Sequence, residues 1–155
     1  MPVTHQAKII VVGTSHTIQI ADPGLGLFLE NLCREFTIRA VAEEMNDEAL
    51  IEKNCTSTIP MQIANSLKLP HRLCDPNRAE RSELGIRQEN EIRIQAWLSS
   101  SPLPAPELAA RVTESYAMRE RYWLKRLSEL DIWPVLFVCG ADHVSSFCEL
   151  LKQQS

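Results

Sequence analysis

The chain has the length and composition of an ordinary globular protein, with 155 residues of which 45% are hydrophobic and 23% charged. This is enough chain for one core, and we expect a single domain over residues 1–155. The net charge of −4, without a basic run, argues against nucleic acids and anionic membranes as partners. No apolar run reaches the about 18 residues that span a bilayer, and no signal peptide is recognisable. We therefore expect a cytoplasmic protein.

The five cysteines support the same location. They are odd in number and include no C-x-x-C pair, and Cys74 and Cys139 lie in apolar runs where a thiol acts as a small hydrophobe. We expect them to be reduced and buried.

Four short apolar runs alternate with helical segments along the chain. The runs that predict strands are residues 8–12, 37–42, 71–74 and 134–139. The segments that predict helices are residues 27–36, 47–53, 60–69, 88–98, 107–130 and 145–152, with a loop of serines and prolines over residues 99–106.

Strands separated by helices predict βαβ units, and therefore an α/β fold. We expect a roughly four-stranded, mostly parallel sheet with helices on both faces; the strand order does not follow from the sequence. Right-handed crossovers bring the carboxyl ends of such strands to one edge. The residues that follow the four runs are ionisable: His16, the pair Glu43-Glu44, Asp75 and His143.

Two tetrapeptides of the same form follow the first and last strands. They are Gly13-Thr14-Ser15-His16 and Gly140-Ala141-Asp142-His143. Five glycines and four histidines in the chain make even one Gly-x-x-His match unexpected by chance. Because the carboxyl edge of an open α/β sheet is where ligands bind, both histidines are candidates for one site. The alternative is a structural hydrogen bond to a neighbouring loop. His5 and His71 lack the pattern, and we expect them to be surface or structural residues.

The acidic candidates have structural alternatives too. Glu43 and Glu44 point to opposite faces of the strand, so at least one can reach the site, and Glu43 is closer to the strand end. The structural alternative is that the pair only begins a solvated acidic segment. Asp75 precedes Pro76 and could simply cap the next helix, and Asp142 could orient the backbone of its own turn.

One arginine falls on the apolar stripe of the helix predicted over residues 107–130. Arg119 lies between Val112 and Trp123 on that face, whereas Arg121 points almost the opposite way. A buried guanidinium needs an anionic partner, which the carboxylates at the sheet edge or a substrate oxyanion would supply. The alternative is that the side chain extends to solvent.

Two imidazoles and one or two carboxylates suit a divalent metal such as Mn, Co, Zn or Fe. The same groups without metal suit general acid–base catalysis. The chain contains no G-x-G-x-x-G, G-x-x-x-x-G-K-[ST], H-E-x-x-H or G-x-S-x-G motif, and Ser15 lacks the glycine of a nucleophile elbow.

The order of these motifs resembles the Tiki/TraB superfamily, which includes erythromycin esterase-like and ChaN-like proteins. The matching features are the two Gly-x-x-His motifs, Glu43-Glu44 between them, and Arg119 before the second; the stretch over residues 119–151 is the most similar. The resemblance implies an α/β fold with clustered His and Glu residues. It also implies a hydrolase, metal-dependent in some members, while other members bind haem.

Our leading hypothesis is a metal-assisted hydrolase that acts on an amide, ester or related bond of a small-molecule or peptide substrate. His16, Glu43 and His143 would bind the metal, Glu44 as the second glutamate would handle the proton of the attacking water, and Arg119 would stabilise the oxyanion. A metal-free hydrolase with histidine as base is one alternative. The other is a non-catalytic protein that binds a metal, haem or a small anionic ligand. The oligomeric state does not follow from the sequence.

Overall fold

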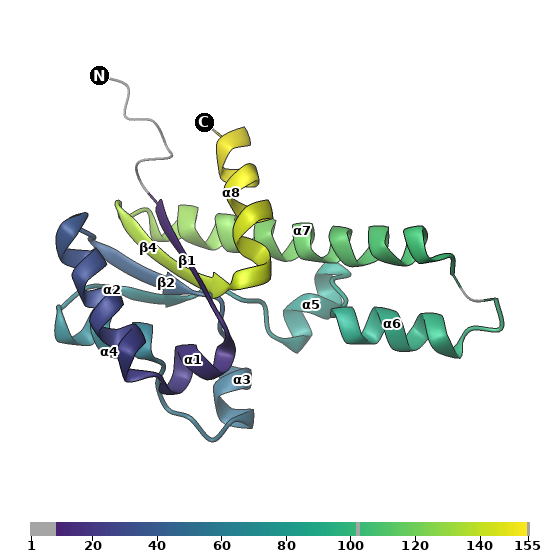
Figure 1. Cartoon of the computed structure of the whole chain (residues 1–155), viewed down its shortest axis with the longest axis horizontal. Helices are drawn as coiled ribbons and strands as arrows, with labels where there is room; N and C mark the ends of the chain where they lie inside the picture. Colours follow the sequence, from purple (N-terminus) through teal and green to yellow (C-terminus); the bar gives the residue numbers. More distant parts are fainter. Residues whose placement is uncertain (1–8, 102, 155) are drawn as a thin grey trace.

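A computed structural model describes residues 9–101 and 103–154, which form a four-stranded parallel sheet covered by helices (Figure 1). The strand order is β1-β4-β2-β3, and every neighbouring pair is parallel. The strands are β1 (Ile9–Thr14), β2 (Ala40–Glu43), β3 (His71–Leu73) and β4 (Val135–Gly140). The predicted α/β fold is therefore confirmed. We expected the first strand to begin at Lys8, which lies outside the described residues, as does His5.

Eight α-helices and one short 3₁₀ turn connect and cover the strands in the described part of the chain. They are α1 (His16–Ala21), α2 (Pro23–Glu35), α3 (Asp47–Glu52), α4 (Ile59–Ser66), α5 (Arg78–Leu84), α6 (Glu89–Leu98), α7 (Ala105–Leu130), the turn Ala141–His143 and α8 (Val144–Gln153).

Helices α1 and α5 are not predicted from the sequence because both are short and are defined by their caps. The Ser15 side chain accepts a hydrogen bond from Ile18 N at the start of α1. Asn77 and Glu80 form a reciprocal capping box at the start of α5. Short capped helices have too few apolar positions to give a periodic pattern.

The second strand begins at Ala40, three residues later than predicted. Thr37 is left-handed, with φ of 51°, and the N–H of Ile38 donates to the carbonyl of Cys33. These residues therefore end α2 rather than begin β2.

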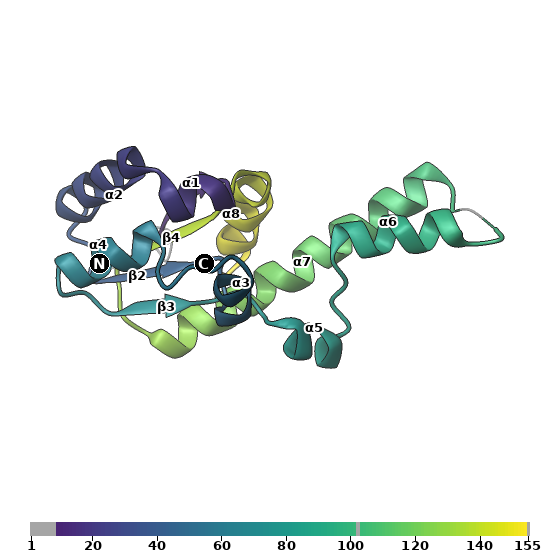
Figure 2. The ribbon, with the colours of Figure 1, turned by 90° about the horizontal axis from the view of Figure 1, so that it is seen from below.

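Alternate residues of the central strand β4 contribute to two hydrophobic cores, one on each face of the sheet. Leu136 and Val138 pack with the buried residues of α2 and α4. Val135, Phe137 and Cys139 pack with those of α7 and α8. Helices thus cover both faces, as predicted, and Figure 2 shows α2 and α4 on one side of the sheet with the carboxyl half of α7 on the other.

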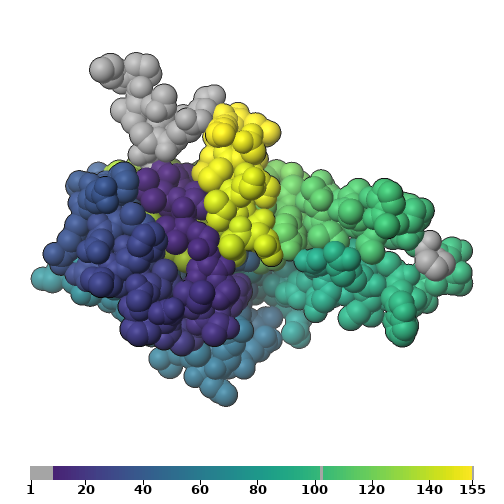
Figure 3. Space-filling model, viewed as in Figure 1, coloured from purple at the N-terminus to yellow at the C-terminus, as the bar shows by residue number. Residues whose placement is uncertain are grey.

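The amino half of α7 extends beyond the sheet and packs against α6, forming an arm that projects from the body of the molecule (Figures 1 and 3). Several large apolar side chains of α6 are exposed on this arm, including Trp97 (82% exposed) and Leu98 (69% exposed). No helix in the described residues is long and apolar enough to cross a membrane.

The carboxyl ends of the strands meet at one edge, as parallel pairing requires. The helices that follow β1 pack on one face of the sheet, whereas α8, which follows the neighbouring strand β4, packs on the other. In open α/β sheets, such a change of face between neighbouring strands marks the ligand-binding crevice.

Candidate functional site

The glycines that begin the two Gly-x-x-His motifs both lie at close approaches. A Cβ on Gly13 would be 2.6 Å from Val144 Cγ2 and 3.1 Å from Ala141 Cα, so glycine lets β1 lie against the turn that follows β4. A Cβ on Gly140 would be 3.2 Å from Oε1 of Glu44, and the Gly140 N–H donates to that oxygen at 2.7 Å. The two motifs therefore pack against each other, with Glu44 against the second.

The carboxylate of Glu44 is the point at which the predicted site residues meet. Its Oε2 lies 4.0 Å from Nε2 of His16 and 4.0 Å from Nε2 of His143, and it accepts a hydrogen bond from Arg119 at 2.6 Å. The Glu44 side chain is only 4% exposed, and that of His16 is 41% exposed. The structure thus brings both histidines, one glutamate and Arg119 together.

Arg119 is held by two carboxylates. The same terminal nitrogen that binds Glu44 donates to Oδ1 of Asp75 at 2.9 Å, and Trp123 Nε1 donates to this oxygen at the same distance. Asp75 therefore belongs to the site cluster and does not cap α5, whose cap is Asn77. Arg119 lies against the acidic edge of the sheet with only 16% of its side chain exposed, rather than extending into solvent.

The charges of this cluster shift one another's pKa values. Burial alone would raise the pKa of Glu44, but His16, Arg119, His143 and the Gly140 N–H outweigh it and the pKa is lowered. Burial raises the pKa of Asp75, because Arg119 offsets the loss of water only in part and the nearby charge of Glu44 adds to the rise. Burial would lower the pKa of Arg119, but its two carboxylates raise it further above its usual value.

Glu43, which we expected to bind metal with the histidines, lies on the opposite face of β2. Its Oε1 accepts from Gln19 at 2.7 Å, and its Oε2 accepts from Thr58 at 2.6 Å and contacts Nε2 of His71. Strand alternation explains the split, since Glu43 shares its face with Val41 and Glu44 shares the other face with Ala42. The predicted pairing of Glu43 with His16 and His143 is therefore wrong in geometry: Glu44 takes that place. Of the two roles expected for His71, surface or structural, its contact with the buried Glu43 fits the structural one.

His143 is enclosed on several sides. Tyr116 stacks on its ring with centroids 4.2 Å apart, and Trp123 packs in an edge-type arrangement with centroids 4.7 Å apart. Its Nδ1 lies 2.9 Å from Oε2 of Glu120, which is 1% exposed and also accepts from Ser146 at 2.7 Å. The His143 side chain is consequently only 6% exposed.

Four buried carboxylates lie in this region, and two of them, Glu44 and Asp75, contact one guanidinium, that of Arg119. The side chains of Glu43, Glu44, Asp75 and Glu120 are between 0% and 7% exposed, and among their partners in the described residues only Arg119 is permanently charged. Uncompensated buried charge is costly, so a cation bound beside Glu44 would stabilise the cluster. Within residues 9–101 and 103–154, no three His, Cys, Asp or Glu side chains form a ready-made metal site.

Sequence analysis missed three polar residues that contact Glu43 or His143. Glu120 had a usable signal, since the spacing from Tyr116 through Glu120 and Trp123 to Leu127 places it on the buried stripe of α7. Gln19 lies one turn after His16, but only the structure reveals α1. Thr58 gave no signal beyond its typical helix-cap chemistry, and it does cap α4. Asp142 is exposed.

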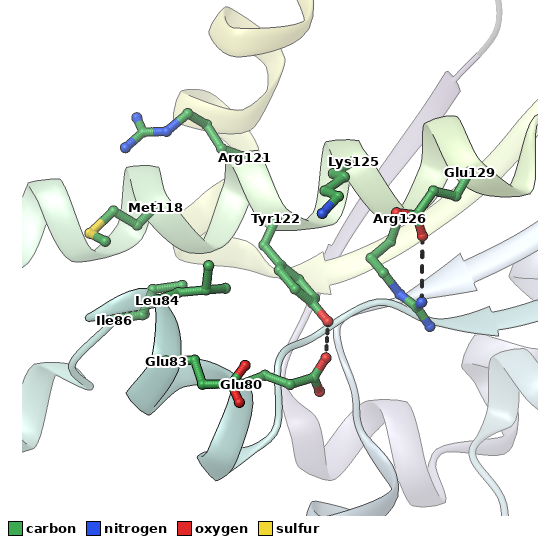
Figure 4. Close-up of a pocket in the computed structure, with 10 residues that line it drawn as sticks. All are labelled: Glu80, Glu83, Leu84, Ile86, Met118, Arg121, Tyr122, Lys125, Arg126 and Glu129. Carbon is green, nitrogen blue, oxygen red and sulfur yellow. Dashed lines mark hydrogen bonds and ion pairs between the residues drawn. The ribbon is translucent and has the colours of Figure 1, made fainter.

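A separate pocket of about 560 Å³ lies between α5 and α7 (Figure 4). Its floor includes Leu84, Ile86 and Met118, and the Tyr122 hydroxyl donates to Glu80 at one side. None of its lining residues belongs to the cluster around Glu44.

Comparisons with protein-family models, with curated proteins and with solved structures found no match to this chain, so the resemblance to the Tiki/TraB superfamily rests on the motifs alone.

Proposed function

We propose that this protein is a hydrolase that cleaves an amide, ester or related bond with the help of a divalent metal held by His16, Glu44 and His143. The observation on which the proposal depends is the convergence of two imidazole nitrogens on one buried carboxylate oxygen, each at 4.0 Å. The substrate would be a small molecule or peptide bound at the carboxyl edge of the sheet.

The donor set fits a metal of the Mn, Co, Zn or Fe type, since it combines two nitrogens with one carboxylate. Two ligands that each lie about 2.1 Å from one ion are about 3.4 Å apart in a tetrahedral site. The observed 4.0 Å is longer, so both imidazoles would have to move toward Glu44 when a metal binds. The excess of buried carboxylates favours a cation at this place. A bound metal would supply Lewis-acid polarisation of the scissile carbonyl.

Arg119 is the residue that we assign to the developing oxyanion. Its Nε and one terminal nitrogen bind the two carboxylates, which fix the plane of the guanidinium. The other terminal nitrogen has no hydrogen-bond partner among the described residues and remains a donor for substrate. With Glu44 as the metal ligand, the second glutamate that would handle the proton of the attacking water is Glu43. Glu43 does not suit this role, because its carboxylate already accepts hydrogen bonds from Gln19 and Thr58.

A metal-free hydrolase is the second candidate, and the contact between His143 and Glu120 favours it. A histidine held by a buried carboxylate through Nδ1 is arranged as a general base at Nε2. A protein that binds a metal, haem or a small anion without turnover would use the same groups.

Metal analysis of the purified protein, followed by a panel of amide and ester substrates, separates these alternatives. We expect bound metal and turnover in the wild type, both lost in His16→Ala and both kept in Asp142→Ala, an exposed control on the same edge. Turnover that survives removal of metal by a chelator would replace the proposal with the metal-free hydrolase. Bound metal without turnover on any substrate would replace it with a binding protein.

A further inference from the structure

We infer that Glu120 is a positioning residue that holds His143 in the tautomer with its proton on Nδ1. Oε2 of Glu120 lies 2.9 Å from this nitrogen, and the carboxylate is almost completely buried. An ionised carboxylate accepts hydrogen bonds and donates none, so the ring nitrogen that faces it carries the hydrogen. The metal-dependent function proposed above assigns no role to Glu120; only its metal-free alternative uses the contact between Glu120 and His143.

A second donor strengthens this arrangement. Ser146 on α8 donates its hydroxyl to the same oxygen of Glu120 at 2.7 Å. Helix α7 supplies the acceptor, while the turn after β4 and α8 supply the two donors. The hydrogen bonds from Ser146 and His143 together orient the Glu120 carboxylate, so that its Oε2 faces Nδ1 of His143 as an acceptor.

Two aromatic rings prevent His143 from turning over. Tyr116 stacks on one face with an interplanar angle of 27°, and Trp123 lies edge-on at 65°. With the ring fixed and Nδ1 directed at Glu120, Nε2 lies on the side of Glu44, 4.0 Å from its Oε2. In the neutral ring this nitrogen has a lone pair and no proton, as both a metal ligand and a general base require.

His16 has no equivalent support. Its side chain is 41% exposed, and no second carboxylate holds its Nδ1 among the described residues. The two Gly-x-x-His motifs therefore differ in function: the second presents a ring of fixed tautomer, and the first presents one that adjusts to what binds. The consequence for turnover rests on the proposed function, but the tautomer does not.

Nitrogen-15 NMR of the imidazole rings in the full chain tests the inference at a pH where the histidines are neutral. The His143 signals are assigned by their loss in His143→Gln. We expect a protonated Nδ1 and a bare Nε2 in the wild type, and the same pattern in Ser146→Ala, which removes a donor and leaves the acceptor. Glu120→Gln keeps a carbonyl acceptor and should keep the tautomer, whereas Glu120→Leu should lose it.

A wild-type His143 with its proton on Nε2 would overturn the inference without any variant, so the test does not depend on how well Glu120→Leu folds. A folded Glu120→Leu protein that keeps the Nδ1 proton would overturn it too. If turnover exists, Glu120→Leu should lower it about 10- to 100-fold, with recovery in Glu120→Gln. A wild type that has the expected tautomer but hydrolyses no substrate would remove the proposed function and leave the inference standing.

Discussion

Glu43 and Glu44 are neighbours in sequence, equally buried and chemically identical, yet the protein surrounds them in opposite ways. Glu43 is bonded by Gln19 and Thr58 and contacts His71, side chains from α1, the cap of α4 and β3. Glu44 meets His16 at the start of α1, His143 in the turn after β4, and Arg119 on α7. The two imidazoles are 4.0 Å away, too far for a hydrogen bond. The first carboxylate ties elements together, whereas the second has two imidazoles beside it that are not hydrogen-bonded to it.

The comparison teaches that burial alone does not identify a functional carboxylate. What distinguishes Glu44 is that three of its neighbours are ionisable side chains. The net charge of this cluster can therefore change when a proton or an ion binds. Glu43 has uncharged donors on both oxygens and one histidine, which is the pattern of a satisfied structural group. Substitutions around Glu43 should therefore mainly lower stability, whereas substitutions around Glu44 should mainly weaken binding.

The largest loss of stability should come from Glu43→Gln. An amide in this place directs its NH₂ group at a buried donor, either that of Gln19 or that of Thr58. We expect the free energy of unfolding in urea to fall by about 3–5 kcal/mol, because two hydrogen bonds to a charged carboxylate are disturbed and each contributes about 1.5–3 kcal/mol. A loss below about 1 kcal/mol would show that Glu43 does not hold these elements together.

Arg119→Leu should lower the free energy of unfolding by less, about 2–3 kcal/mol at neutral pH. The variant leaves Glu44 and Asp75 without their shared cation, but the loss is limited because Arg119 is partly exposed. Glu44 has a lowered pKa, so it contributes stability that is present above its usual pKa of 4.5 and is lost as the pH falls through the folded value. The Asp75 pKa is already raised and would rise further without Arg119. The difference in the free energy of unfolding between wild type and variant, measured in urea, should therefore become smaller below about pH 4.5. A variant that is as stable as the wild type at pH 7 would remove Arg119 from the cluster.

Tyr122→Phe measures how much one hydrogen bond contributes to stability away from Glu43 and Glu44, since the Tyr122 hydroxyl donates to Glu80 of α5. Burial and the bond to Glu80 raise the Tyr122 pKa to about 12. A raised pKa contributes stability that is complete below pH 10 and is lost as the pH rises toward 12. The variant should lose about 0.5–1.5 kcal/mol at pH 7, and absorbance titration should show one tyrosine fewer ionising near pH 12. Ionisation of Tyr122 near pH 10 in the wild type would contradict this.

His16→Ala should have the smallest effect on stability, within about 0.5 kcal/mol, because the side chain is 41% exposed and makes no close hydrogen bond. Metal binding and turnover should nevertheless be lost. A variant that unfolds more easily by 2 kcal/mol or more would assign His16 to the fold and not to the site.

Much of this arrangement was predictable from the sequence because it depends on local patterns. The apolar runs before Gly13 and Gly140 predicted β1 and β4, and parallel pairing then placed His16, Glu44, Asp75 and His143 at one edge. The position of Arg119 on the apolar stripe predicted its burial and its acidic partners.

The remaining features depend on contacts between distant segments. Strand order decides that β4 lies between β1 and β2, and no local pattern encodes it. The choice of Glu44 over Glu43 depends on which face α7 covers. The support that Glu120 gives to His143 joins residues 23 positions apart on two elements.

Calorimetric titration of Mn²⁺ or Zn²⁺ into the wild type, Glu44→Gln and Thr58→Val tests the central claim most directly. Thr58→Val perturbs the Glu43 side while keeping the side-chain shape. We predict one ion per chain in the wild type and in Thr58→Val, and no binding in Glu44→Gln at unchanged fold. Absence of binding in the wild type, or binding that survives in Glu44→Gln and is lost in Thr58→Val, would contradict the assignment of Glu44 as the carboxylate of the site.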